Sequence, residues 1–335
     1  MFQGVSDARV RWCAVAGLAV ALVSARPGRA VAVADAPSAP EAAPDPAPGP
    51  AAAAASGDKG SVSATPPPRK VEWSPEWPRF RWWEYAGTAL VGGTSLYLRY
   101  YRKLPPDAKW QGDNPIDGAI RSWLRADTTS GRAEAGKVSD VVYWGGVVFP
   151  FAVDLPVTLL VHRAPGVTWQ LLWMDIEANA VAGFMTNALF ITAGRGRPSH
   201  EDCAVDPSYD SLCGATGNNA SFPSGHTVGV ATAAGLVCVH HHYLPLYGGG
   251  AGATAACIGL SAAVAATAIS RVVADRHYFT DGLIGAGLGY AAGYGLPWLL
   301  HYRYGSSAAN EQPPRAMLVP FGGSGAVGLG VLGFL

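Results

Sequence analysis

One short polar stretch gathers reactive side chains between two long apolar runs. It extends from Ser270 to Asp281 and reads SRVVADRHYFTD. Charge is costly in such a place unless something uses it. His277 and Asp281 are four residues apart, so a helix that begins near His277 would place them on one face. There the carboxylate can bind one imidazole nitrogen and leave the other free to react, although such pairs also occur at ordinary solvated helix ends.

Three more ends of apolar runs carry groups suited to binding an oxyanion. They hold Arg195, Arg197 and Pro198; Pro223, Ser224, Gly225 and His226; and Ser270 and Arg271. If the runs cross a membrane in alternation, these ends and His277 meet at one face of it. Arg197 and Arg271 can each present a fork of donors to phosphate oxygens. Ser224 and the amides of a helix that starts there add neutral donors, and the helix dipole favours an anion.

Two histidines remain for covalent and acid–base work at this site. His277, oriented by Asp281, can attack phosphorus, and His226 can protonate the leaving oxygen. No set of Cys, His and carboxylate residues in the sequence has the spacing of a metal site. We therefore expect a metal-independent reaction that uses no cofactor.

These residues resemble the three motifs of the type 2 phosphatidic acid phosphatases, whose superfamily also contains bacterial acid phosphatases and vanadium-dependent haloperoxidases. The similarity lies in Arg197-Pro198, in Pro223-Ser224-Gly225-His226, and in Ser270-Arg271 followed by His277 and Asp281. It covers about residues 138–300. The resemblance implies a helical bundle and a phosphorylated His277, with Asp281 as its partner and His226 as general acid. It also implies that the phosphoryl group is held by Arg197, Ser224, Gly225 and Arg271.

The sequence departs from this pattern at one position. The first motif of the family begins with a lysine seven residues before the arginine, and here that residue is Phe190. Loss of a phosphate-binding cation costs a few kcal/mol of transition-state stabilisation, on the order of 2–4, unless another group replaces it. Arg195 lies in the same loop as Arg197, so we hypothesise that Arg195 partly compensates.

Composition places the chain among membrane proteins. Of its 335 residues 49% are hydrophobic and only 14% are charged, which is a low charge content for a soluble protein. The formal net charge is zero and no long run of Lys or Arg occurs, so we expect no nucleic acid partner. The expected partners are the bilayer and a lipid phosphate substrate, and no protein partner is predicted.

The expected fold is an all-α, multi-span helical membrane bundle with five to six spans, a disordered N-terminal tether and a short Gly-rich, strand-like C-terminal tail. The stronger spans are 138–161, 167–193, 228–247, 251–273 and 282–300. Residues 1–34 are typical of a secretory signal sequence, which we prefer to a permanent anchor. The remaining divisions are an Ala/Pro-rich linker over 35–70, an interfacial segment with a possible first span and a loop over 71–137, the phosphatase core over 138–304, and the tail over 305–335.

Cysteine and histidine placement adds three expectations. Cys203 and Cys213 lie ten residues apart in a polar loop, where we prefer a disulfide to two free thiols, and this requires an oxidising compartment. Cys238 and Cys257 lie in apolar runs and are expected to be small buried hydrophobes. The consecutive histidines at 240–242 point in different directions around a helix, which favours interfacial side chains over a metal cluster.

The leading hypothesis is a membrane phosphatase that hydrolyses a lipid phosphomonoester or pyrophosphate through a phosphohistidine. A non-catalytic lipid-phosphate-binding protein is the alternative that Phe190 suggests, and a vanadate-dependent haloperoxidase is a further one. The orientation signals conflict, because the basic loop over 99–137 favours a cytoplasmic site while the cysteine pair favours an oxidising side. A cleaved signal followed by a spanning segment over 82–98 also counts to a cytoplasmic site. We expect an integral membrane protein of the cell envelope whose site faces the periplasm, which requires an uncleaved, non-spanning N-terminus or a first segment that does not cross.

Overall fold

The computed structural model describes residues 70–335 except 211, 215–218, 305–315, 324–325 and 334–335. The signal sequence expected over 1–34 and all of the expected linker except Lys70 lie outside the described residues. The chain divides into the units Met1–Arg69 and Lys70–Leu335, and all of the described residues belong to the second unit.

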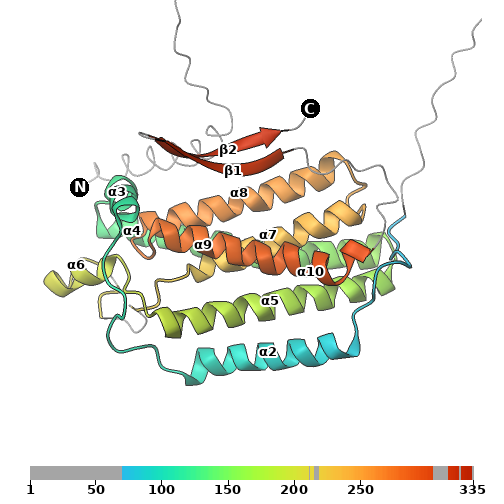
Figure 1. Ribbon diagram of the computed structural model, residues 1–335, viewed down its shortest axis with the longest axis horizontal. Coiled ribbons are helices and arrows are strands. Elements are labelled where there is room, and N and C mark those ends of the chain that lie inside the picture. Colours follow the sequence, from blue (N-terminus) through green and yellow to red (C-terminus); the bar gives the residue numbers. More distant parts are fainter. Residues whose placement is uncertain (1–69, 211, 215–218, 305–315, 324–325, 334–335) are drawn as a thin grey trace, which may run out of the picture. The chain divides into compact units, whose positions relative to one another are not determined.

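The described part of the chain is mostly helical (Figure 1). Its α-helices are α2 Trp82–Tyr101, α3 Pro115–Leu124, α4 Thr129–Phe149, α5 Pro165–Ala193, α6 Ser199–Val205, α7 Gly225–Tyr243, α8 Ala251–Val273, α9 Phe279–Tyr290 and α10 Leu296–Leu300. Wider π-helical turns continue two of these helices, Pro150–Asp154 and Val157–Val161 after α4 and Ala291–Gly295 after α9, and a short 3₁₀ turn, Tyr302–Tyr304, follows α10. In the tail, strand β1 (Ala316–Gly323) pairs antiparallel with strand β2 (Ala326–Gly333).

Within the described part of the chain, three helical segments are long and apolar enough to cross a membrane. They are Thr129–Val161, Ala251–Val273 and Phe279–Tyr304. The other long helices, α2, α5 and α7, are not among these segments, and they contain buried polar residues such as Asp175 in α5 and His240 in α7. The expected count of five to six spans therefore stays a prediction.

Helix α7 is the centre of the bundle. It packs against α4, α5, α8 and α9, and most of its residues are buried. Figure 1 shows α7 running beside α8 and α9. Because the first turn of α7 carries Gly225 and His226, this central position places them among residues from four neighbouring helices.

A row of glycines brings α9 into direct contact with the backbone of α7. A Cβ atom at Gly289 would lie 2.4 Å from the carbonyl oxygen of Val228, and one at Gly293 would lie 2.0 Å from that of Thr232. No side chain fits at such distances, so only glycine permits this approach. At the same interface the amide of Ser224 donates to the carbonyl oxygen of Asp281 over 3.0 Å. The close packing therefore fixes the start of α9 to the start of α7.

The expectation that all three histidines of 240–242 are interfacial is wrong for two of them. His240 and His241 are buried, whereas His242 is exposed. The Nδ1 atom of His240 lies 2.8 Å from the hydroxyl of Tyr302, and its Nε2 lies 3.1 Å from Asp175 Oδ1. His241 Nε2 lies 3.2 Å from Asp154 Oδ1. Acidic side chains of the neighbouring helices thus compensate for the burial of these imidazoles.

Both cysteine pairs of the described chain are disulfide-bonded. The bond between Cys203 and Cys213 closes the polar loop as expected. The expectation that Cys238 and Cys257 are separate buried thiols is wrong, because they form a second disulfide with their Cα atoms 4.6 Å apart. Cys238 lies on α7 and Cys257 on α8, and the packing of these two helices brings the residues together.

Candidate active site

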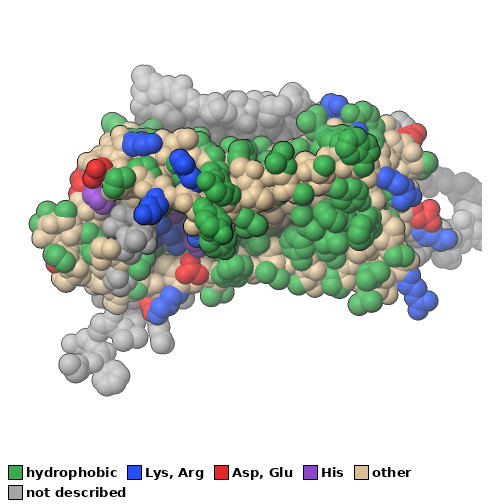
Figure 2. All heavy atoms as spheres, turned by 90° about the horizontal axis from the view of Figure 1, so that it is seen from below, with side chains coloured by type: hydrophobic (Ala, Val, Ile, Leu, Met, Phe, Trp, Pro, Cys, Tyr) green, Lys and Arg blue, Asp and Glu red, His purple; other side chains and the backbone are tan. Residues whose placement is uncertain are grey.

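A cavity of about 1030 Å³ opens where α2, α4, α5, α7, the end of α8 and the adjoining loops meet. Five predicted site residues line it: Arg197, Gly225, His226, Arg271 and His277. Figure 2 shows Lys and Arg side chains gathering around a hollow in the left half of the face seen from below, with a broad area of hydrophobic side chains right of the centre. Residues from separate segments of the sequence thus meet in one cavity, as their positions at the ends of apolar runs predict.

His277 presents one defined nitrogen to this cavity. The imidazole is 3% exposed, and its Nδ1 lies 2.6 Å from the carbonyl oxygen of Ser221. A carbonyl can only accept, so Nδ1 carries the proton and Nε2 keeps its lone pair. Burial, Arg271 and Arg197 together hold the pKa of His277 well below its usual value. The imidazole is therefore neutral, which is the form that a nucleophile requires.

The expected direct hydrogen bond between Asp281 and His277 is absent. Asp281 Oδ2 lies 4.0 Å from His277 Nδ1, which is beyond hydrogen-bonding distance. Oδ2 instead accepts from the hydroxyl of Ser221 at 2.6 Å and from the amide of Tyr278 at 3.0 Å. Because the carbonyl of the same Ser221 holds Nδ1, Asp281 positions His277 through Ser221. The physical reason is that α9 begins at Phe279, after His277, so the four-residue spacing does not lie within one helix.

Arg195 lies outside the cavity, buried beneath it. Its guanidinium donates to Asp281 Oδ1 at 2.5 Å, to Asp117 Oδ2 at 2.9 Å and to the hydroxyl of Thr280 at 3.1 Å. It also stacks over the rings of Trp110 and Tyr278, with its carbon 4.0 and 3.9 Å from their centroids. The carboxylates of Asp117 and Asp281 thus accept from the guanidinium of Arg195, which the hypothesis of partial compensation for the missing lysine had assigned to phosphate. The geometry makes Arg195 a support for Asp281 and leaves the position of the missing lysine without a replacement from this loop.

His226 has a partner that the motifs do not include. Its Nε2 lies 2.8 Å from Asp140 Oδ1 on α4, and its ring packs against Tyr143 with the centroids 4.6 Å apart. His226 lies outside the three candidate spans and precedes the expected span over 228–247. Burial and the charge of Arg271 lower the pKa of His226 to about 4, while Asp140 acts to raise it. A carboxylate beside the ring favours the protonated form that a general acid requires.

Arg197 and Arg271 are two of the cationic groups that line the cavity. Arg271 donates to the hydroxyl of Ser139 at 3.2 Å and lies 3.6 Å from Asp140 Oδ1. Its Nε is buried and has no hydrogen-bond partner among the described residues, and such a donor favours an anionic ligand. Burial and the nearby Arg276 lower the pKa of Arg197 to about 10. Arg197 is therefore still a cation at neutral pH.

The start of α7 and the end of α5 complete the cavity. Ser224 is buried, accepts from the hydroxyl of Thr227 at 2.9 Å, and is the N-cap residue of α7. Phe190 lines the cavity, and a Cβ atom at Gly225 would lie 3.3 Å from its ring. The position at which the family pattern has lysine thus holds an aromatic ring that packs against the first residue of α7.

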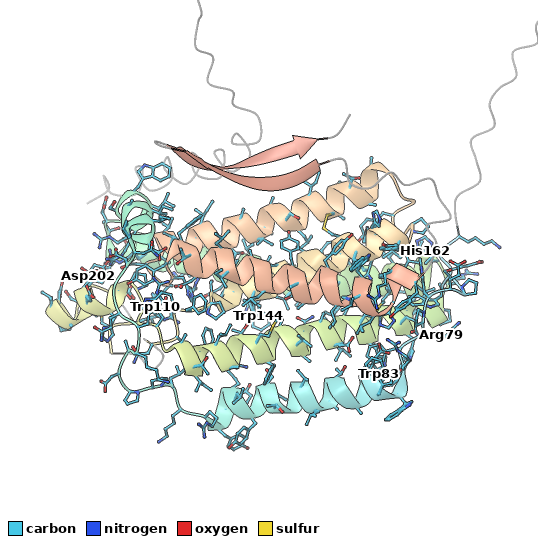
Figure 3. All side chains as sticks on the ribbon, in the orientation of Figure 1. Arg79, Trp83, Trp110, Trp144, His162 and Asp202 are labelled. Atoms are coloured by element: carbon cyan, nitrogen blue, oxygen red, sulfur yellow. A yellow bond between two sulfur atoms is a disulfide. The ribbon has the colours of Figure 1, made fainter. Side chains whose placement is uncertain are left out.

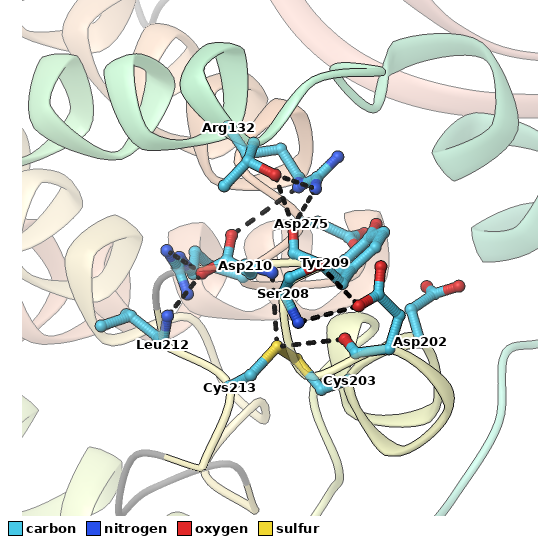
Figure 4. The surroundings of a disulfide bond; sticks show 12 residues. Arg132, Asp202, Cys203, Ser208, Tyr209, Asp210, Leu212, Cys213 and Asp275 are labelled. Atoms are coloured by element: carbon cyan, nitrogen blue, oxygen red, sulfur yellow. Dashed lines mark hydrogen bonds and ion pairs between the residues drawn. A yellow bond between two sulfur atoms is a disulfide. The ribbon is translucent and has the colours of Figure 1, made fainter.

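The disulfide loop braces the segment that carries the nucleophile (Figure 4). Tyr209, between Cys203 and Cys213, donates its hydroxyl to Asp275 Oδ2 at 2.7 Å, and Asp210 lies 2.8 Å from a nitrogen of Arg276. Arg121 of α3 also binds Asp275, with two donor distances of 2.7 and 2.8 Å. Because Asp275 and Arg276 immediately precede His277, these contacts restrict the position of His277.

Several of these supporting residues were not identified from the sequence. In the sequence Asp140 interrupts the apolar run over 138–161, and Asp117, Ser221 and Asp275 belong to none of the three motifs. A carboxylate inside an apolar run is the signal that identifies Asp140 as a candidate. For Ser221 the sequence carries no comparable signal, because its role depends on a backbone carbonyl.

Comparison with known proteins gives one match. Residues 172–304 match the family model described as the PAP2 superfamily. The matched segment contains the three predicted motifs, whereas α2, α3 and α4 precede it. No curated protein and no solved structure matches the chain.

Proposed function

We propose that this protein is a metal-independent membrane phosphatase that hydrolyses a lipid phosphomonoester or pyrophosphate. The proposal starts from residues 172–304, which match the PAP2 superfamily, whose members are generally phosphatases. One observation carries the proposal: a neutral His277, two arginines and His226 line the same cavity. Such a cavity combines a nucleophile, cationic donors for phosphoryl oxygens and a general acid.

The reaction proceeds in two displacements at phosphorus. Nε2 of His277 forms a bond to phosphorus as the bond to the leaving oxygen breaks, and His226 transfers its proton to that oxygen. The carbonyl of Ser221 accepts a hydrogen bond from Nδ1–H of the phosphohistidine and disperses its positive charge. In the second step His226 takes a proton from water, the water oxygen bonds to phosphorus, and the bond to Nε2 breaks. Inorganic phosphate leaves, and both histidines return to their starting forms.

Arg197 and Arg271 hold the phosphoryl oxygens throughout these steps. The buried, unpaired Nε of Arg271 gains a partner only when an anion is bound. Interactions that strengthen as negative charge develops on the equatorial oxygens lower the barrier of both displacements. Asp140 stays beside His226 and Arg271 and links the proton donor to the anion site.

Phe190 supports a second candidate function. Because its ring lines the cavity in place of a cation, a lipid-phosphate-binding protein without turnover remains the alternative. The two functions differ in one measurable property, since a binding protein retains the lipid phosphate and releases no inorganic phosphate.

Replacement of the nucleophile tests the proposal. We expect His277→Ala to lower phosphate release from a lipid phosphate by at least about 10³-fold, because the covalent step is lost. His242→Ala is the matched control, since His242 is an exposed histidine at the other end of α7, and it should keep the wild-type rate. Full activity of His277→Ala would exclude the phosphohistidine mechanism. A wild-type protein that binds the lipid phosphate without hydrolysing it would establish the alternative.

The orientation belongs to the same proposal. We place the cavity on the periplasmic side of the membrane, and the disulfide between Cys203 and Cys213 supports this because such bonds persist in oxidising compartments. The loop that this disulfide closes contacts the segment before His277, so the loop and the cavity face the same side.

A further inference from the structure

The cavity contains two more arginines that the catalytic mechanism does not use. Arg99 and Arg102 lie at the C-terminal end of α2, and both line the cavity that holds His277. They are three residues apart, which places them on one side of the helix. Both side chains are exposed, whereas Arg271 at the back of the cavity is buried.

Among the residues that the structure describes, no carboxylate lies within ion-pair distance of the guanidinium of Arg99 or of Arg102. Other arginines of the described chain are paired: Arg121 and Arg125 with Asp202, Arg132 and Arg276 with Asp210, and Arg195 with Asp117. A cation near a helix C-terminus interacts favourably with the helix dipole, by about 0.3–1 kcal/mol, but this effect does not require two arginines inside a cavity.

The proposed mechanism assigns other groups of the cavity to the scissile phosphoryl group and does not use this pair. Arg197, Arg271 and His226 contribute the cationic groups around it, and Phe190 on α5 contributes none. The α2 pair is therefore available for another anion. Leu96, Leu98 and Tyr100 line the same wall of the cavity, so this second anion would lie beside an apolar surface.

We propose that Arg99 and Arg102 form a second anion subsite, and that the substrate is a phosphate ester with a second negative group next to the scissile phosphoryl, of which a diphosphate is the simplest. This inference rests on the proposed function. His277 Nε2 bonds to the terminal phosphorus, the bridging oxygen leaves with the bonding electrons and receives the proton of His226, and the inner phosphate stays on the alcohol. The arginine pair stabilises the charge that develops on this inner phosphate as it leaves.

The test compares two substrates of one alcohol. The full-length protein in neutral detergent is assayed with the monophosphate and the diphosphate of the same short isoprenoid alcohol, and kcat/KM is measured for each. For Arg99→Gln/Arg102→Gln we expect a loss of about 30- to 300-fold on the diphosphate, as for two charge-assisted hydrogen bonds, and less than about 3-fold on the monophosphate. Lys103→Gln is the matched control, because it removes a neighbouring cation that does not line the cavity; it should leave both values within about 2-fold.

Three outcomes would overturn the inference. An equal loss on both substrates would mean that the pair acts on the scissile phosphoryl group, and no loss on either would mean that it binds no substrate. A loss that appears only in vesicles containing anionic lipid would assign the pair to the membrane surface instead. In each case the abolition of both activities by His277→Ala would show that the proposed function still holds.

A binding measurement separates the subsite from turnover. In His277→Ala we expect inorganic pyrophosphate to bind at least about 10-fold more tightly than inorganic phosphate, and we expect Arg99→Gln/Arg102→Gln in that background to remove this difference. Equal affinity for the two anions in His277→Ala would contradict the subsite even if the wild-type protein proved catalytically inactive.

Discussion

At the scale of single residues, the sequence predicts which side chains reach the cavity better than it predicts what they touch. Arg197, His226, Arg271 and His277 meet because each lies at the end of a helix, and helix ends can be located from apolar runs and turn residues. Their partners come from elements distant in sequence. The pairing of Asp140 with His226 spans 86 residues, and periodicity carries no information on such contacts.

Asp140 gives a prediction on the pH dependence of the reaction. The active form needs a neutral His277 and a protonated His226. Both pKa values are lowered by burial and by Arg271, so both limbs of the kcat/KM profile should lie below pH 6.5, and activity should fall as pH rises because His226 loses its proton. Asp140→Asn removes the negative charge that raises the pKa of His226, so the alkaline limb should move to lower pH by about one unit.

The control for this experiment is Glu134→Gln on the same helix. Glu134 is exposed, pairs with Lys137 and does not line the cavity, so its replacement should leave the profile unchanged. A uniform loss of activity in Asp140→Asn with both limbs in place would assign Asp140 a structural role only.

At the scale of elements, the contact of α9 with α7 helps to position His277, which precedes the start of α9. The sequence indicates the apolar helices that correspond to α7 and α9, and glycines recur along α9. Their spacing alone does not show which of these glycines face α7. Gly287 has open space beside it, whereas a Cβ atom at Gly289 would lie 2.4 Å from one backbone oxygen and 2.5 Å from the Cβ of Ala231. The same distinction explains why the His277–Asp281 pair was predicted with the wrong geometry: the exact start of α9 depends on this packing.

Gly289→Ala tests the importance of the α7–α9 contact. The added methyl group cannot be accommodated without moving one helix, so we expect the free energy of unfolding to fall by about 1–3 kcal/mol. Activity should fall as well, because the hydrogen bond from Ser224 to Asp281 crosses this interface. Thermal unfolding in detergent and kcat are the measurements.

Gly287→Ala supplies the matched control on the same helix. With no atom within 4 Å of the added methyl group, it should be neutral or stabilising by up to about 1 kcal/mol, as expected for alanine in place of glycine in a helix. Equal melting temperatures of the two variants would show that the close approach of α9 to α7 does not limit stability.

At the scale of the whole molecule, both orientation signals concern the same end of the bundle. Figure 3 shows Trp110 and Asp202 at one end of the helices and Arg79 and His162 at the other. The basic segment over 99–137 and the disulfide loop meet at the first end, where Arg121 binds Asp202 and Asp275. The positive-inside tendency and the disulfide therefore make opposite predictions for one surface, and the sequence alone does not decide between them.

Two variants, each with a single thiol at one end of the bundle, resolve this conflict. Cys213→Ser, combined with serine at 13, 238 and 257, leaves Cys203 as the one thiol of the chain. In intact spheroplasts we expect an impermeant maleimide to label Cys203 without lysis, because the proposed periplasmic cavity and its loop are then exposed to the reagent. Arg79→Cys in a background with all five cysteines replaced is the matched control. Arg79 is exposed at the other end, so with an uncleaved N-terminus on the cytoplasmic side this thiol should react only after lysis. The reverse pattern, with Cys203 protected and Arg79→Cys labelled, would place the cavity on the cytoplasmic face and would leave the formation of the Cys203–Cys213 bond in a reducing compartment to be explained.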